Sequence, residues 1–293
     1  MPPKTKIRKI EAFAMHARTD AGPADYLGVF EAFKKLRSKF RIVQTPDKLV
    51  AVPRVTQGAV DSFFVVYEGP VGMSPLIFNA QNAQERIEQL DAAEVLVTKT
   101  HVLADPGRRE VLVEFNARGA RARDVALVIQ EAVRTVDGWE SLQLHFQPIA
   151  GSNFHDALGE FERVRIASLK LARPNYDWNE HYNGLSELAA DSDAQTIDVS
   201  AYAERGGSLS KRRGLLRLLR DLLNNTTNAV VQAKVTGNRT GEPGETTISL
   251  ENFIEHHRVQ VAMTNDGHVE TADMREQLFR YLEERRRTRG KQE

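Results

Sequence analysis

The spacing of apolar residues divides the first third of the chain into short strands and two helices. Apolar runs and alternating patterns predict strands at residues 6–17, 48–55, 62–67, 76–79 and 94–103. Helical spacing predicts helices at residues 24–40 and 82–90. The turn at Ala104-Asp105-Pro106-Gly107 separates two apolar runs and predicts a hairpin whose second strand covers residues 109–115. This region therefore reads as a curled antiparallel sheet with two helices.

The middle of the chain has the most regular pattern. After the strand at 109–115, the apolar positions predict a helix at 121–136, a strand at 142–146 and a short helix at 153–161. A strand at 164–172, a helix at 177–190 and a strand at 196–202 follow. This is the β-α-β-β-α-β order of the ferredoxin-like unit, although other α+β sandwiches share it. We expect an α+β protein with mixed, largely antiparallel sheets and a ferredoxin-like βαββαβ middle region.

The last third begins with an amphipathic helix at residues 206–225. Strands are predicted at 229–235, 246–250 and 258–263, followed by a turn at Asn265-Asp266-Gly267 and a helix from about residue 271. The pattern suggests three consecutive regions: a sheet-rich region at 1–107, the ferredoxin-like region at 108–205 and a C-terminal region at 206–293 that bears the amphipathic helix.

Composition narrows the class of protein. Lys and Arg total 40, as do Asp and Glu, so the formal net charge is zero and argues against a chain that coats nucleic acid over its whole surface. There are no cysteines, which excludes disulfides and thiolate chemistry and fits a cytoplasmic location. No apolar run approaches the length of a membrane span, so we expect no membrane insertion. The charge is uneven, however: residues 201–250 carry eight basic and four acidic side chains.

The amphipathic helix carries the clearest functional signal. Its buried stripe consists of leucines at 215, 216, 219, 222 and 223, and Arg213, Arg217 and Arg220 follow helical spacing on the opposite face. Lys211, Arg212 and Arg213 would occupy the first turn, with Ser208 or Ser210 as N-cap. Cations are unfavourable there by roughly 0.3–1 kcal/mol each, so a bound anion would explain them. A solvated basic face is the alternative.

Two other clusters have both a chemical and a structural interpretation. Asp177, Glu180 and His181 could form the metal site of a nuclease, but Asp177 and Glu180 also match a capping box for the predicted helix. The C-terminal run of Arg285, Arg286, Arg287, Arg289 and Lys291 could contact phosphates or be a solvated helix end; we expect it to be poorly ordered without a partner. No Walker loop, nucleophile elbow or zinc motif is present.

Three segments support a resemblance to known proteins. These are IASLKLARPN at 166–175, TIDVSAYAER at 196–205 and the Gly-Gly-Ser-Leu sequence at 206–209. From about residue 95 to 223 the chain resembles a bacterial family found near mobile elements, and in organisation it resembles the family of exclusion protein A of the lambda Rex system. The resemblance implies a dimeric, cytoplasmic, sequence-tolerant DNA-binding protein that acts in phage exclusion or another anti-phage response. No individual site residue is inferred from the resemblance.

These observations lead to one main functional expectation and two alternatives. We expect a non-catalytic protein that binds the backbone of DNA or RNA, with Lys211, Arg212, Arg213, Arg217 and Arg220 as the contacts and without a cofactor or metal. The resemblance adds a homodimer and a possible partner protein from a defence operon. The alternatives are a metal-dependent nuclease and a scaffold subunit whose basic helix binds an acidic protein.

Overall fold

The computed structural model divides the chain into two compact units. Unit 1 comprises Met1–Glu11, Ala17–His145 and His257–Glu293, and unit 2 comprises Ala12–His16 and Phe146–His256. Each unit is thus built from segments far apart in the sequence, unlike the three consecutive regions suggested above. The structure describes residues 4–58, 60–79, 81, 84–91, 94–172, 192, 194, 196–224, 230–241 and 243–289.

Unit 1 is built mainly from one large sheet. Its strands are β1 (Thr5–Thr19), β2 (Gly22–Pro23), β3 (Ile42–Gln44), β4 (Lys48–Ala51), β5 (Val55–Gln57), β6 (Ser62–Pro70), β9 (Thr98–Asp105), β10 (Glu110–Phe115), β11 (Gln143–Pro148) and β16 (His256–Ala262). The order is β11-β1-β10-β9-β6-β4-β3, with β16 and β2 paired to β1 and β5 paired to β6. β1, β11 and β16 contribute residues to both units.

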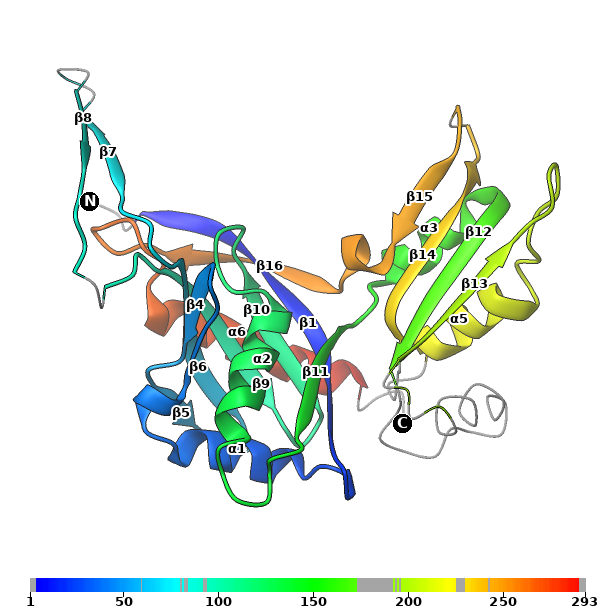
Figure 1. Cartoon of the computed structure of the whole chain (residues 1–293). Coiled ribbons are helices and arrows are strands. Elements are labelled where there is room, and N and C mark those ends of the chain that lie inside the picture. Colours follow the sequence, from blue (N-terminus) through cyan, green and yellow to red (C-terminus); the bar gives the residue numbers. More distant parts are fainter. Residues whose placement is uncertain are drawn as a thin grey trace. The chain divides into compact units, whose positions relative to one another are not determined.

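Four helices accompany this sheet: α1 (Tyr26–Lys35), the 3-10 helix η1 (Ser38–Phe40), α2 (Ala122–Val133) and α6 (Thr271–Arg289). α2 contacts α1, β3 and β4, and α6 contacts β9. Figure 1 shows α2 in front of the sheet and α6 behind it. β9 and β10 are buried at nearly every position, as expected for strands covered on both faces.

The predicted hairpin at residues 94–115 is confirmed in its pairing. β9 and β10 are antiparallel, with Glu110 opposite Asp105 and Val113 opposite Val102. The predicted helix at 82–90 is wrong: β8 (Gln84–Ile87) pairs antiparallel with β7 (Leu76–Asn79), with Leu76 opposite Ile87. The sequence of this short segment allows either structure, and pairing with β7 decides it.

α6 buries the apolar side chains of Met274, Leu278 and Leu282, and ion pairs near its C-terminal end add to its contact with the sheet. Arg285 forms an ion pair with Glu110, and both side chains are less than 5% exposed. Arg286 donates to Asp105 Oδ2 from Nε at 3.0 Å and from Nη2 at 2.7 Å. The expectation that the chain is poorly ordered from Arg285 onward is therefore wrong, because α6 continues to Arg289 and two of its last arginines have acidic partners on β9 and β10.

Asp61, an acidic residue near Arg286, gives a prediction about the pH dependence of stability. Asp61 is buried and lies 3.9 Å from Arg286. Burial raises the pKa of Asp61 above its ordinary value; the charge of Arg286 opposes the rise and that of Asp105 adds to it. When a carboxyl has a higher pKa in the folded than in the unfolded state, the protein loses stability as the pH rises from the unfolded pKa of about 3.9 toward the folded pKa.

We therefore expect Asp61→Asn to become more stable relative to the wild type as pH rises through that interval, and the difference to level off above it. Urea unfolding at a series of pH values measures the difference. Asp137→Asn removes the same charge from an exposed position and is the control. A stability difference that is the same at every pH would show that the ionisation of Asp61 does not oppose folding.

Unit 2 is a two-layer structure. Its sheet has the order β13-β12-β14-β15, from β12 (Phe161–Ala172), β13 (Thr196–Tyr202), β14 (Val230–Arg239) and β15 (Thr246–Ser249), and every pairing is antiparallel. The helices are α3 (Ser152–Gly159), α5 (Gly214–Asn224) and the 3-10 helix η3 (Leu250–Phe253). Position 237 of β14 requires glycine because the backbone of β12 lies so close that a Cβ atom there would be 2.0 Å from the Arg163 carbonyl oxygen.

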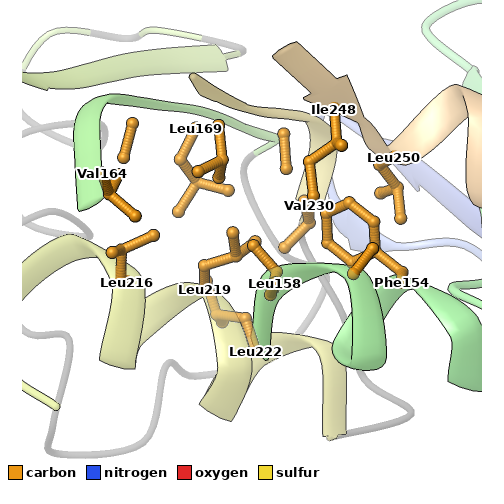
Figure 2. Packing of buried hydrophobic residues seen from close by; sticks show 14 of the residues in the cluster. Phe154, Leu158, Val164, Leu169, Leu216, Leu219, Leu222, Val230, Ile248 and Leu250 are labelled. Carbon is orange, nitrogen blue, oxygen red and sulfur yellow. The ribbon is translucent and has the colours of Figure 1, made fainter. Parts of the chain in front are cut away.

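The core of unit 2 lies between the sheet and these helices. Figure 2 shows Leu216, Leu219 and Leu222 of α5 pointing toward Val164, Leu169 and Val230 of the strands, with Phe154 and Leu158 of α3 beside them. The leucine stripe predicted from the sequence is thus confirmed as the buried face. Leu219 is 1% exposed and lies in the middle of this cluster.

The α+β class with antiparallel sheets is confirmed, but the four strands of the predicted ferredoxin-like region do not form one sheet. β10 and β11 belong to the sheet of unit 1, and β12 and β13 belong to the sheet of unit 2. The order of elements along the chain does not specify which strands pair. The region of the second predicted helix, 177–190, lies outside the described residues. No described helix is both long enough and apolar enough to cross a membrane.

Candidate nucleic-acid interface

The basic segment, which we define as residues 205–220, has six basic and no acidic side chains. Its first part runs along β12. The Ala203 N–H donates to the Arg165 carbonyl at 2.8 Å, and the Leu209 N–H donates to the Val164 carbonyl at 2.8 Å. Between them the chain makes a turn closed by the Gly207 N–H and the Glu204 carbonyl, with Gly206 at a φ of 86°. Backbone pairing to β12 therefore positions this part of the segment.

The helix begins later than the sequence predicts. α5 starts at Gly214, whose φ of 62° is readily adopted only by glycine. Lys211, Arg212 and Arg213 precede the helix and do not occupy its first turn. The predicted cap is also different, because Ser208 Oγ accepts the Val164 N–H at 3.0 Å. The positive φ at Gly214 interrupts the helical path, so the predicted row of three arginines on one helix face is wrong for Arg213.

Two of the five predicted contacts are engaged within unit 2. Lys211 Nζ donates to the carbonyl oxygen of Phe161, at the start of β12. Arg220 Nη1 donates to the Lys211 carbonyl at 3.1 Å, so Arg220 connects α5 to the segment that precedes it. Burial and the positive charge of Arg220 both lower the pKa of His155 on α3, while Asp156 opposes them. Through their hydrogen bonds to backbone carbonyls, Lys211 and Arg220 therefore hold the basic segment in place.

The other three cations point to solvent. Arg212 and Arg213 are exposed, and neither side chain has a hydrogen bond or ion pair with any residue that the structure describes. The Arg217 side chain is 69% exposed, with its Nε 3.4 Å from the Asp221 carboxylate four residues later. Exposed pairs of this kind contribute only about 0.3–0.5 kcal/mol, so a phosphate can compete for Arg217. These three guanidiniums form the candidate contact surface.

Three further basic residues of unit 2 were not among those identified from the sequence, and two of them lie on the sheet face opposite α5. Arg205 is exposed in the turn before Gly206, and Lys234 is exposed on the face of the sheet opposite the core. Lys170 shares that face and lies 3.8 Å from Asp198. The period-two alternation of β12 and β14 could have shown that these lysines point away from the apolar core.

The candidate metal residues of the alternative function are not placed. Asp177, Glu180 and His181 lie outside the described residues. Within the described ranges, no group of three or more His, Cys, Asp or Glu side chains is arranged to hold a metal ion.

Comparison with known proteins gives no relative: neither the scan against protein-family models nor the search of curated proteins finds a match for this chain.

Proposed function

We propose that this protein binds nucleic acid through its phosphate backbone, with little readout of base sequence. Arg212 and Arg213 carry the proposal, because they are two adjacent exposed guanidiniums without a described acidic partner. Arg217 adds a third charge whose present partner is exposed. Contacts of arginine to phosphate position a protein on nucleic acid without selecting a sequence.

The proposed roles of the five predicted residues differ. Arg212, Arg213 and Arg217 contact phosphates, and Lys211 and Arg220 keep the segment in the conformation that presents them. The resemblance of the segments at 166–175, 196–205 and 206–209 supports a role in phage defence or exclusion as a cytoplasmic homodimer that acts with a partner protein from the same operon. That part of the proposal rests on the resemblance alone.

The test is a triple substitution, Arg212→Gln, Arg213→Gln and Arg217→Gln. Glutamine removes the charge and keeps helix propensity at position 217, so the fold should be retained. Each lost phosphate contact should flatten the slope of log affinity against log salt by about 0.9 for duplex DNA, so three contacts predict a change of roughly 2–3. Fluorescence anisotropy with two unrelated duplexes, over a series of salt concentrations, measures the affinity and the slope.

A matched control separates local contact from loss of net charge. Lys35→Gln, Arg86→Gln and Arg123→Gln remove three charges from exposed side chains of unit 1. We expect this control to bind with nearly the wild-type slope. Equal slopes for the wild type and the variant at 212, 213 and 217 would remove the basic segment from the interface. Loss of an acidic protein partner by that variant, with no nucleic-acid binding by the wild type, would favour the scaffold function.

A further inference from the structure

Unit 1 contains a chain of three polar side chains, of which two are buried and the third is half-buried. Glu114 on β10 and His101 on β9 are each 1% exposed. Glu114 Oε2 lies 2.6 Å from His101 Nδ1, and the same oxygen accepts the backbone N–H of His101 at 3.2 Å. On the other side of the ring, His101 Nε2 lies 3.1 Å from Thr271 Oγ1. Carboxylate, imidazole and hydroxyl thus follow one another at hydrogen-bond distances.

The environment selects one arrangement of the protons. Arg8 Nε lies 3.3 Å from Glu114 Oε1, so the carboxylate faces a cation on one side and the imidazole on the other. An ionised carboxylate only accepts hydrogen bonds, so a neutral His101 carries its proton on Nδ1. Nε2 then has a free lone pair, and the Thr271 hydroxyl donates to it. Phe63 stacks on the imidazole with ring centroids 6.2 Å apart, and the His101 side chain is almost fully buried.

Thr271 also lies at a favourable place on α6. It is the first residue of this 19-residue helix and is half-buried, next to the exposed Ala272. The Met274 N–H donates to the Glu270 carbonyl at 3.0 Å, so the N–H groups of Ala272 and Asp273 have no acceptor within the helix. The Asp273 carboxylate accepts the Ala262 N–H at 2.5 Å. Free N–H groups at a helix N-terminus can stabilise an oxyanion.

We propose that Thr271 is a nucleophile for acyl transfer, with His101 as its general base and Glu114 as the residue that positions the imidazole. The substrate class is an activated ester. Thr271 Oγ1 forms a bond to the acyl carbon, and its proton passes to His101 Nε2. When the tetrahedral intermediate collapses, the bond to the leaving alcohol breaks and His101 returns the proton to that alcohol. Water then hydrolyses the acyl-threonine by the same proton path, releasing the acid and restoring Thr271.

The energetics of burial support a role beyond attaching α6 to the sheet. A single neutral hydrogen bond would suffice for attachment, whereas burying a carboxylate and a histidine carries a desolvation cost. A base oriented by a third group and within reach of a hydroxyl is the arrangement that activates weak nucleophiles. The inference concerns unit 1 and is independent of the nucleic-acid function proposed for unit 2.

The test uses the full chain and p-nitrophenyl acetate. We expect mass spectrometry to find an acetyl group on Thr271, and p-nitrophenol release to show a burst equivalent to the protein concentration. Thr271→Val should abolish both while keeping the shape of the side chain, and Thr271→Ser should retain both. His101→Gln should lower the acylation rate by about 100-fold or more, in line with the usual contribution of a general base. Circular dichroism checks that each variant is folded.

Acetylation confined to lysine side chains would overturn the proposal, as would equal burst amplitudes for the wild type and Thr271→Val. Labelling of Thr271 that is unchanged in a folded His101→Gln variant would also overturn it, because the hydroxyl would then react without the base. If His101→Gln does not fold, the Val and Ser variants at position 271 still decide whether this hydroxyl is the acceptor.

Discussion

Glu110→Ala should lower the free energy of unfolding of unit 1 by about 3–5 kcal/mol, because it leaves the guanidinium of Arg285 buried without its carboxylate. Both side chains of this ion pair are almost fully buried. Tyr281 Oη accepts a hydrogen bond from Arg285 Nη1 at 3.3 Å but cannot replace a negative charge. Urea unfolding followed by the fluorescence of Trp139, in a Trp178→Phe background, measures the effect in unit 1.

A double substitution provides the matched control. Glu110→Leu combined with Arg285→Met removes both charges and fills the space with apolar atoms. Replacement of a buried ion pair by apolar residues is often neutral or stabilising, so we expect the double variant to recover most of the lost stability. If Glu110→Ala alone costs less than about 1 kcal/mol, the pair would behave as a solvated surface ion pair and its buried placement would be wrong.

Leu219→Ala should destabilise unit 2 by about 2–5 kcal/mol, the range for removing a buried leucine side chain that leaves a cavity. Leu219 is central to the contact between α5 and the sheet (Figure 2). Because the chain has two compact units, a single unfolding transition is not assured, and local stability should be measured directly. Amide hydrogen exchange in peptides covering β12 and β14 reports the stability of this core.

Arg217→Ala, two residues earlier on the exposed face of α5, is the control for Leu219→Ala. It removes a large side chain from solvent, and we expect a change within about 0.5 kcal/mol. Equal exchange rates in the two variants would mean that α5 does not cover the sheet. Faster exchange in Leu219→Ala confined to β12, β14 and α5 would agree with the cluster shown in Figure 2.

Several elements were predictable because their signals are local. The turn predicted at residues 104–107 is found two residues later, at 106–109 between β9 and β10, and the turn at 265–267 includes Gly267 at a φ of 78°. The regularly spaced apolar residues that predict the helix at 121–136, which are Val125, Val128, Ile129 and Val133, are all buried in α2. The helix predicted at 24–40 ends at Lys35 instead, because Leu36 is extended and Arg41 donates to the carbonyls of Phe33 and Lys34 near the helix end. This boundary therefore depends on a side chain that lies only a few residues beyond the helix.

The candidate interface was predictable in part. The run of basic residues is visible in the sequence, but which of them remain exposed depends on partners elsewhere in the fold. Lys211 is engaged by the Phe161 carbonyl, fifty residues away, and Arg220 by the Lys211 carbonyl. The Glu114, His101 and Thr271 chain had no sequence signal, because Thr271 is 170 residues from His101.

By itself, the sequence determined the α+β class, the leucine stripe that buries α5 and the clear turns. These features depend on residues close together in the chain, whose spacing sets a strand or helix period and whose glycines allow positive φ. Only the tertiary structure decided which strands share a sheet, where α5 begins and which cations face solvent. Strand pairing and buried ion pairs join residues far apart in the sequence, so local periodicity carries no information about them. Arg285 and Arg286 are an example. They belong to a run of basic residues that suggests a solvated helix end, but in the structure they form ion pairs with Glu110 and Asp105.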